Sequence, residues 1–399
     1  MDEPEFGPDH QPLPEGGWSE SMTTLHDAIV VPPVESQFVQ EAGILHADGR
    51  YCPEGALWRK YRPITTEPSM PAQIDETLPG RWLWGGVLWA HFGHFLVESA
   101  SRMWALSHLD KPVDGILFIP KRPKVGEEVR GFHREYFGLM QPGLPVKATA
   151  NPVRVEELVV PGQGFGLGKI IAGTPKYRAA VHRDFARDVK PDGPEKIYIS
   201  RSKLGLGKGG LLGEERLEEY LGRDGYEVFH PQEHSLTEQL ARYKAARKVV
   251  AADGSALHMF AMVGRADQPV AMILRRQSDA NNLLALNVAH FCGSSPLVIN
   301  ALQTEWVPKT KKKSSRLSFG ELNHAGIGQA LEQDGFISDG SHWAPLTAEE
   351  RDQLLVDKGM GGNDLFVESP AFVKARVRAV RQARRERRAR KQSAQNAAE

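Results

Sequence analysis

The stretch KVVAADGSALHMFAMV, residues 248–263, decides the fold of the second half of this chain. Its first five residues favour a short buried strand, and the residues after the turn at Asp253-Gly254-Ser255 are typical of an apolar helix. Backbone N–H groups are unpaired where a helix begins, and such groups bind anions, diphosphates included. An ordinary strand-to-helix turn has the same pattern. We predict an anion site made of Asp253, Gly254, Ser255, Ala256 and Leu257.

Short apolar strands alternate with helices on either side of this stretch. The strands are KIYIS (196–200), YEVFH (226–230), PVAMILR (269–275) and PLVIN (296–300). This alternation predicts a parallel, doubly wound sheet, in which ligands bind beyond the carboxyl ends of the strands. Arg201 falls at such an end, where its planar guanidinium could hold two phosphate oxygens, and Lys203 follows two residues later. An exposed basic pair in a loop is the competing interpretation.

A second polar set lies in HFGHFLVESASRMWAL, residues 91–106, between the predicted strands RWLWGGVLW (81–89) and GILFIP (115–120). On a helix, His94, Glu98 and Arg102 share one face, and a histidine with a carboxylate four residues later is suited to proton transfer near neutral pH. An amphipathic helix with a charged outer face explains the same spacing. A metal site at His91, His94 and Glu98 is less favoured, because the sequence offers no clear distant ligand.

The length of 399 residues suits two domains with tails, and 41% apolar and 25% charged residues are typical of a globular chain. Cys52 and Cys292 are far apart and form no CxxC motif, which argues against a disulfide framework and a zinc site. No apolar run is long enough to span a membrane, and the acidic N-terminus lacks the features of a signal peptide, so we expect a cytoplasmic protein. The expected segments are an irregular lead-in (1–75), a first lobe (76–190), a second lobe (191–300), an extension (301–372) that ends in a helix at TAEERDQLLVDKG, and a basic tail (373–399).

The net charge of zero hides an uneven distribution. Residues 374–391 contain ten Lys or Arg and one acid, so they carry +9 and the rest of the chain carries −9. This run has few helix breakers, and we expect it to form a helix once an anionic partner neutralises it. A solvated tail, an anionic membrane surface and nucleic acid are the three interpretations. Nucleic acid is the least favoured, because no aromatic or base-reading motif accompanies the charge. A membrane partner would place the protein at the inner membrane face.

The motifs in both halves together resemble glycosyltransferase family 61, the capsular-polysaccharide type. GGVLWAHFGHFLVESASRMWAL resembles the first signature of the family through His94, Glu98, Arg102 and Trp104. KIYISR, the step GYEVFHPQEHSLTEQ and the turn at GSAL resemble its second half, and the similarity spans about residues 81–300. One departure is Asp253, where relatives usually carry histidine. A carboxylate there would repel a diphosphate unless it turned towards a ribose hydroxyl or a nearby cation.

The resemblance implies a GT-B-like α/β fold, in which two Rossmann-like, doubly wound lobes face a cleft and close around the substrates. It implies an inverting transfer of a hexosyl or pentosyl group from a nucleotide-sugar donor to a saccharide or similar hydroxyl acceptor, in capsular or surface polysaccharide biosynthesis. His94 or Glu98 would take the acceptor proton, with Arg102 orienting Glu98, and the second lobe would bind the donor. The sequence contains no DxD motif, and we expect no metal or other cofactor.

Two other functions stay open. A catalytically silent nucleotide- or sugar-binding partner in polysaccharide assembly would account for Asp253. An NAD-dependent oxidoreductase would use Gly205, Gly207 and Gly210, which match GxGxxG after a strand and before a helix. However, the next strand ends at His230, where an acid should hold the ribose hydroxyl.

Overall fold

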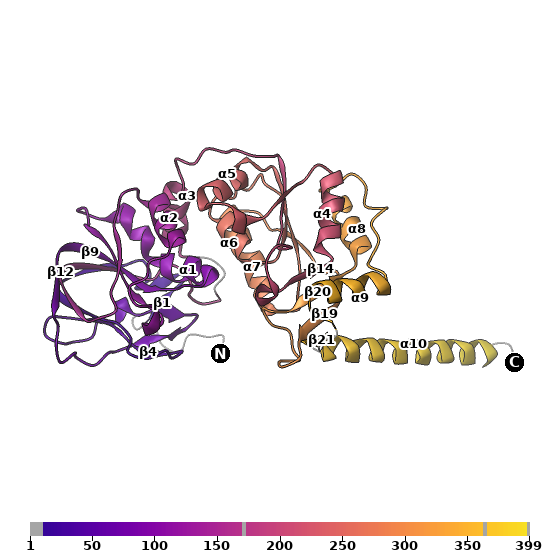
Figure 1. The fold of residues 1–399 in the computed structure, drawn as a ribbon, viewed down its shortest axis with the longest axis horizontal. Helices are drawn as coiled ribbons and strands as arrows, with labels where there is room; N and C mark the ends of the chain where they lie inside the picture. The colour runs from indigo at the N-terminus through magenta and orange to yellow at the C-terminus, as the bar shows by residue number, and fades with distance from the viewer. Residues whose placement is uncertain (1–10, 170–172, 362–364, 397–399) are drawn as a thin grey trace.

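The computed structural model describes residues 11–169, 173–361 and 365–396. Over these residues it is a mixed α/β structure with three larger sheets, of six, five and four strands (Figure 1). The six-stranded sheet forms a first lobe, and the other two sheets form the rest of the molecule. This confirms the predicted α/β class.

The first sheet contains β3 (Met22–Val31), β5 (Gly43–Leu45), β9 (Glu76–Leu88), β10 (Gly115–Pro120), β11 (Val146–Ala148) and β12 (Val153–Pro161). Its strand order is β11-β10-β9-β12-β3-β5. Neighbouring strands from β11 to β12 are parallel, whereas β12, β3 and β5 pair antiparallel. The strands predicted at RWLWGGVLW and GILFIP are confirmed as parts of β9 and as β10.

Helices cover one face of this sheet. Leu83 and Phe118 share a core there with Phe95, Trp104 and Phe137. These aromatic side chains come from the helical segments α1 (Phe92–Val97), η3 (Ser99–His108, a 3-10 helix) and α2 (Gly131–Met140), and α3 (Pro175–Asp184) also packs on this side.

The N-terminal segment covers the opposite face, where Trp84 and Leu117 pack against Ile44, Leu57 and Ile64. The family resemblance implied that the first lobe is doubly wound, and this expectation is wrong, because helices cover only one face of its sheet. All six residues of β10 are buried, so both faces of the sheet need a cover, and the lead-in supplies the second one. Short pairings complete this cover: β1 (Pro12–Leu13) with β2 (Gly16–Gly17), β4 (Gln40–Glu41) with β8 (Thr65–Thr66), and β6 (Trp58–Arg59) with β7 (Arg62–Pro63).

The second sheet is parallel throughout and confirms the predicted alternation of strands and helices. Its order is β15 (Glu227–Phe229), β13 (Lys196–Ile199), β16 (Lys248–Ala252), β17 (Val270–Ile273) and β18 (Leu297–Ile299). One face packs on α5 (Leu236–Ala245), α6 (Ser255–Ala261) and α7 (Asp279–Cys292), and the other on α4 (Glu214–Arg223) and α8 (His324–Gln333). The predicted capping box of Ser235 with Glu238 is present at the start of α5.

The third sheet has the order β14 (Gly210–Leu212), β20 (Phe319–Leu322), β19 (Leu302–Pro308) and β21 (Phe366–Glu368). The predicted helix at TAEERDQLLVDKG is confirmed as α9 (Ala348–Asp357). Gly210 begins a strand of this sheet, and Leu206–Lys208 is a 3-10 turn, so the GxGxxG glycines do not lead directly into a helix. Short 3-10 turns also occur at η2 (Pro53–Gly55), η4 (Pro123–Val125) and η6 (Pro231–Glu233).

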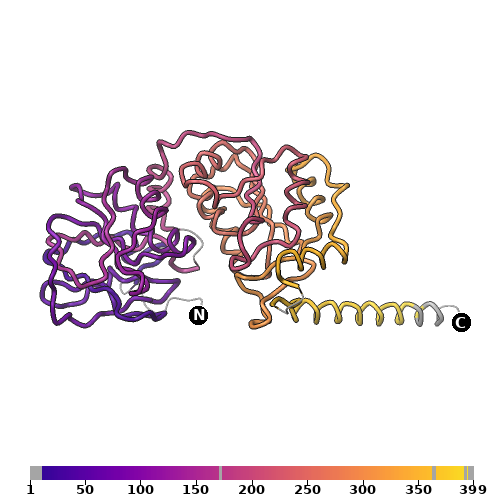
Figure 2. The backbone as a smooth tube through the Cα atoms, viewed as in Figure 1, coloured from indigo at the N-terminus to yellow at the C-terminus, as the bar shows by residue number. Residues whose placement is uncertain are grey.

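The two lobes share one hydrophobic core. The chain crosses between them after α3 (Figure 2), and helices α1 and α2 then lie against α6 and α5 of the second lobe. The Phe165 and Phe291 rings are 5.5 Å apart between centroids, and the Tyr136 hydroxyl lies 3.6 Å from the sulfur of Met262. Because a packed apolar interface restricts domain motion, the contact opposes the wide opening and closing of lobes that the family resemblance implied.

Helix α10 (Pro370–Asn396) follows β21 and extends away from the rest of the molecule (Figure 1). It confirms that the basic tail can be helical. Within the described residues, no helix has both the length and the apolar character needed to cross a membrane.

Candidate active site

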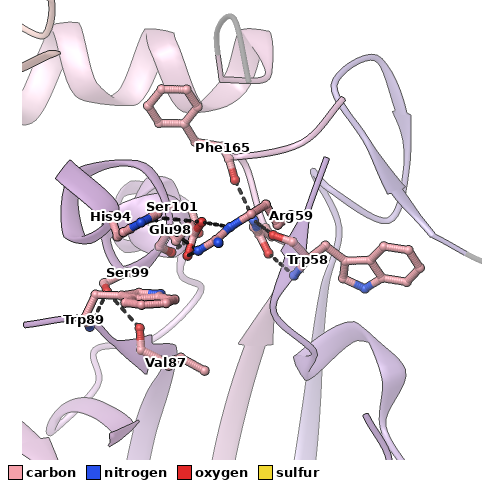
Figure 3. Close-up of polar contacts among 10 residues, drawn as sticks. Trp58, Arg59, Val87, Trp89, His94, Glu98, Ser99, Ser101 and Phe165 are labelled. Atoms are coloured by element: carbon pink, nitrogen blue, oxygen red, sulfur yellow. Dashed lines mark hydrogen bonds and ion pairs between the residues drawn. The ribbon is translucent and has the colours of Figure 1, made fainter. Parts of the chain in front are cut away.

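His94, Glu98 and Arg59 form a polar cluster in the first lobe, with Glu98 buried and His94 partly exposed (Figure 3). Arg59 holds Glu98 with two bonds, from Nε to Oε1 at 2.6 Å and from Nη2 to Oε2 at 2.9 Å. His94 Nδ1 lies 3.5 Å from Glu98 Oε1 and 3.3 Å from Arg59 Nη2. The Glu98 side chain is only 2% exposed, whereas His94 is 42% exposed, so the imidazole is the member of the cluster that solvent and ligands can reach.

The helix changes type at Glu98, and this change fixes the cluster. Helix α1 ends at Val97, and the 3-10 helix η3 begins at Ser99. The Ser101 hydroxyl donates to the Glu98 carbonyl at 2.6 Å, and the Ser99 hydroxyl donates to the Val87 carbonyl at 2.8 Å. The first bond holds the Glu98 backbone to η3, and the second ties the junction to strand β9, so Glu98 is held by backbone as well as by its carboxylate.

Trp89 provides a flat apolar support for this cluster. Its ring stacks on His94 with a centroid distance of 4.6 Å and an interplanar angle of 28°. The Arg59 guanidinium lies 5.2 Å and the Lys121 ammonium 5.6 Å from the Trp89 ring centroid, within cation–π range. Burial, with Arg59 nearby, lowers the pKa of Lys121 to about 8. Three nitrogen-bearing side chains therefore converge on one indole.

Glu98 is poorly suited to accept a proton. Burial raises the pKa of its carboxyl group, but hydrogen bonds with His94 and Arg59 and the Arg59 charge outweigh burial and bring the pKa below its ordinary value. A carboxylate that is buried, held by two hydrogen bonds from Arg59 and of lowered pKa is better suited to orienting His94 than to acting as a base.

Arg102 does not orient Glu98, which is a correction to the expected role. The side chain is fully buried and donates to the carbonyl oxygens of Glu54 at 3.0 Å, Ala56 at 2.7 Å and Pro161. Arg102 thus ties η3 to the N-terminal cover of the sheet. Its place beside Glu98 is taken by Arg59, which lies 39 residues before Glu98.

In the second lobe, Asp253 is turned towards a cation. Its carboxylate lies 3.1 Å from Arg275 Nε and also accepts from the Arg275 backbone N–H at 3.2 Å. Both side chains are almost fully buried, and burial raises the pKa of Asp253 although Arg275 and Arg276 oppose the shift. Asp253 was expected to turn towards a ribose hydroxyl or a nearby cation so as not to repel a diphosphate, and the structure has the second arrangement.

Arg201 lies next to this pair. Its Nη2 donates to the carbonyls of Lys208 at 3.1 Å and Gly209 at 3.3 Å, while its Nε is buried without a partner. Burial, reinforced by the nearby Arg275 charge, lowers the pKa of Arg201 to about 10. Arg276 has a lowered pKa for the same two reasons, and its Nε is likewise buried without a partner.

Glycine at position 254 lets the Arg201 guanidinium lie close to the turn after β16. The backbone of Gly254 is extended, but a Cβ atom at this position would lie 2.7 Å from Arg201 Nη1. Glu214 supports the same region from behind: its Oε1 accepts from the backbone N–H of Arg201 at 2.8 Å and from the Tyr198 hydroxyl at 2.8 Å. Burial raises the pKa of Glu214 to about 7.

The other predicted donor-site residues fall into two groups. Ser255 and Ala256 are half-buried at the start of α6, beside Gly254. Leu257 is fully buried in the core, and its N–H is bonded to the Gly254 carbonyl. Lys203 points to Glu233, with its Nζ 3.0 Å from Oε2, and no contact joins it to Arg201. The described contacts therefore bring together Arg201, Asp253 and Gly254, and leave Lys203 and Leu257 apart.

The elements that carry the two polar sets touch where α1 packs against α6. A Cβ atom at Gly93 would lie 3.6 Å from the Ser255 Cβ, so the start of α1 touches the turn after β16. His91 is at this contact, and its pKa is lowered. Burial is the largest cause, and the charges of His94 and of Arg316 and Lys208, which lie outside the first lobe, add to it. Glu98 itself faces Arg59 and not Arg201.

Neither described pocket joins the two sets. The larger, of about 580 Å³, lies between α4 and α9 and is lined by acidic side chains that include Glu215, Glu219 and Glu349. The smaller, of about 440 Å³, lies near the start of α10. In the part of the chain that the structure describes, no three His, Cys, Asp or Glu side chains gather as a metal site would require.

The model for the family described as Glycosyltransferase 61 matches residues 92–266. This segment belongs to glycosyltransferase family 61. No protein among the curated sequences matches the chain. The glycosyltransferase 61 segment begins at Phe92, the first residue of α1, and ends before β17. It therefore contains His94, Glu98, Arg201 and Gly254.

Sequence reasoning missed five side chains that complete the two clusters. Four of them lie outside the glycosyltransferase 61 segment, namely Arg59, Trp89, Arg275 and Arg276, and Lys121 lies within it. Arg275 could have been found, because it follows the strand next to β16 and must lie at the same sheet edge as Asp253. Arg59 gave no such signal, since it comes from the irregular N-terminal cover.

Proposed function

We propose that the protein is an inverting glycosyltransferase that moves a sugar from a nucleotide-sugar donor to a hydroxyl group of a saccharide acceptor. The family match supports glycosyltransferase activity in general. The observation that carries the finer proposal is the contact of α1 with α6: α1 carries the histidine of the histidine–carboxylate cluster, and α6 follows the turn beside Arg201. This arrangement supports a GT-B-like division of labour, with the acceptor on the first lobe and the donor on the second.

The second lobe is proposed to hold the donor diphosphate. Arg201, Arg275 and Arg276 carry three positive charges, and the carboxyl groups that act on them are those of Asp253, Glu214 and Glu305. Burial brings the pKa of Glu214 to about 7, so this group is only partly charged near neutral pH. Arg201 and Arg276 each have a buried Nε without a partner, and a buried donor without a partner is costly unless an acceptor such as an anion reaches it. The same groups would stabilise the charge that grows on the diphosphate as its bond to the sugar breaks. With arginines in this role, we expect transfer to proceed without a divalent cation.

His94 is the proposed base. If its Nδ1–H points to Glu98 Oε1, 3.5 Å away, Nε2 carries the lone pair and can take the acceptor proton. The acceptor oxygen then attacks the anomeric carbon, and the donor diphosphate leaves with the electron pair of the broken C–O bond. Glu98 and Arg59 are positioning residues in this scheme, because they fix the imidazole and do not reach the reacting atoms.

Isothermal calorimetry with UDP and transferase assays with a panel of nucleotide sugars test the two halves separately. Arg201→Ala should weaken UDP binding at least tenfold, because it removes a charge from the phosphate site. His94→Ala should leave UDP affinity unchanged and lower turnover about 10²- to 10⁴-fold, the usual contribution of a general base. Equal UDP affinity of Arg201→Ala and the unchanged protein would contradict the donor assignment.

His91→Ala is the matched control for the base. His91 is the N-cap of the short helix that carries His94, and the two ring centroids are 5.3 Å apart, but of the two only His94 contacts Glu98. We expect His91→Ala to keep most of the turnover. If His91→Ala loses turnover and His94→Ala does not, the base is misassigned.

The same panel addresses the narrower parts of the proposal, which rest on the family resemblance alone: a hexosyl or pentosyl donor, and a role in capsular or surface polysaccharide biosynthesis.

The two alternative functions, a catalytically silent binding partner and an NAD-dependent oxidoreductase, have lost support. Asp253 is paired with Arg275, so it no longer argues for a catalytically silent protein. The GxGxxG glycines lead into β14, which removes the strand–helix setting that a dinucleotide site needs.

A further inference from the structure

Helix α10 is a strongly charged surface that the function proposed above leaves unexplained. It is 27 residues long and would span about 40 Å at 1.5 Å per residue. It contacts β19 near its start, and every residue from Lys374 to Arg390 is exposed. Figure 1 shows it extending alone beyond β21. Its stability therefore does not come from packing against this chain.

The charges of α10 are not neutralised by the described residues around it. Among Lys374–Arg390, Arg376 pairs with Glu368 at 2.7 Å, and Glu386, the one acid of the stretch, accepts from Gln382. Arginines recur four residues apart, as at Arg381 and Arg385 and at Arg384 and Arg388. Like charges at this spacing destabilise an isolated helix, so a polyanion that binds α10 also stabilises it.

An apolar stripe distinguishes between polyanions. Val373, Val377 and Val380 lie at the i, i+4 and i+7 positions of one helix face, and Val377 and Val380 are 44% and 48% exposed. Continued along the helix, this face carries Arg384 and Arg387, whose long apolar stems can lie on a lipid surface while their charged ends reach the phosphates. Nucleic-acid phosphates offer no partner for exposed valines, whereas the acyl boundary of a bilayer does.

We propose that α10 is a membrane-binding helix, which lies on an anionic lipid surface and holds the protein there. The valine stripe faces the acyl boundary at the end near the body, and the arginine-rich end follows the anionic headgroups. The proposal is independent of the glycosyltransferase chemistry, because none of the contacts described for α10 reaches the two polar clusters. It predicts binding that needs anionic lipid and weakens with salt.

Vesicle co-sedimentation of the full chain tests this directly. The protein should sediment with vesicles of phosphatidylcholine and phosphatidylglycerol at physiological salt, and stay in the supernatant with phosphatidylcholine alone. A variant with Arg384, Arg385, Arg387 and Arg388 changed to Gln should bind at least tenfold more weakly, since each basic residue near an anionic surface contributes roughly fivefold. Unchanged binding of this variant would overturn the proposal.

A matched control removes four charges elsewhere. Arg50, Arg183, Arg187 and Arg247 are exposed and lie outside α10, so their change to Gln alters the net charge equally. This control variant should bind the anionic vesicles like the unchanged protein. A loss as large as that of the α10 variant would mean that overall charge, and not the helix, is responsible, and would overturn the proposal.

Fluorescence anisotropy with a DNA duplex separates the membrane from nucleic acid. Val377→Ser with Val380→Ser should weaken vesicle binding and leave any duplex binding unchanged, because serine and valine have similar helix propensity. Retained vesicle binding by this variant, or binding to the duplex without binding to vesicles, would contradict the membrane assignment. Binding to neither would contradict the proposal as a whole.

Discussion

Glu214 is a buried carboxyl group placed directly behind Arg201, and its titration should be visible in the stability of the protein. Its pKa in the folded state is about 7, against an ordinary value of 4.5, because burial disfavours the charged form. The folded state therefore binds the proton more tightly than the unfolded state between these two pH values. Stability is highest below pH 4.5 as far as this group is concerned, and falls as the pH rises towards 7, by about 3 kcal/mol.

Glu214→Gln should remove this fall, because glutamine does not titrate. Urea unfolding of both proteins at several pH values between 4.5 and 8 measures the difference in slope. Glu215→Gln is the control, since Glu215 is the next residue, exposed and paired with Lys358. Parallel pH profiles for Glu214→Gln and the unchanged protein would rule out Glu214 as the source.

At the level of single residues, spacing predicted one contact correctly and another wrongly. His94 and Glu98 lie four apart and do meet, because both are within reach of one helical turn. Arg102 was expected on the same face, but the change from α-helix to 3-10 helix at Glu98 turns it into the core. Arg59 could not be predicted, since no periodic pattern relates the irregular N-terminal cover to α1.

At the level of elements, the turn from β16 to α6 depends on close approach of backbone and side chain. A methyl group at Gly254 would meet Arg201 Nη1 at 2.7 Å. Because the end of an arginine side chain can move, we expect Gly254→Ala to keep the fold and displace the guanidinium. UDP affinity should fall about tenfold, a change of about 1.4 kcal/mol by calorimetry.

Gly222→Ala provides the comparison for this substitution. Gly222 lies inside α4, and a Cβ atom there meets nothing within 4 Å. Alanine should stabilise the helix by about 0.5–1 kcal/mol and leave UDP affinity unchanged. An unaltered affinity of Gly254→Ala as well would show that the position of Arg201 does not matter for the nucleotide.

Elements of the second lobe were predictable because their strands are short, apolar and separated by helices. The parallel sheet from β15 to β18 and the capping box at Ser235 follow directly from that pattern. The first lobe was harder, since the cover of its second face comes from residues 40–66, whose strands are only two or three residues long. Such segments take their shape from the surface that they cover, and local sequence says little about it.

At the scale of the whole molecule, the shared core predicts that both lobes unfold together. Cys52 is buried in the first lobe and Cys292 in the second, and burial raises the pKa of each thiol to about 12. Cys292→Ala leaves Cys52 as a reporter of the first lobe, and Cys52→Ala leaves Cys292 as a reporter of the second. When each variant is treated with a thiol reagent at increasing urea concentrations, we expect the two cysteines to become reactive at the same urea midpoint. A clearly lower midpoint for Cys292 would mean that the lobes unfold separately.

The separation of charge between α10 and the body makes the molecule a large electric dipole. The sequence pI of about 7.3 describes a balance of +9 on residues 374–391 and −9 on the rest, and not a neutral surface. On ion-exchange media at that pH, the same preparation should be retained by both cation and anion exchangers, through opposite ends of the molecule. Head-to-tail self-association at low ionic strength is the associated hazard, so purification and storage call for enough salt to screen one end from the other.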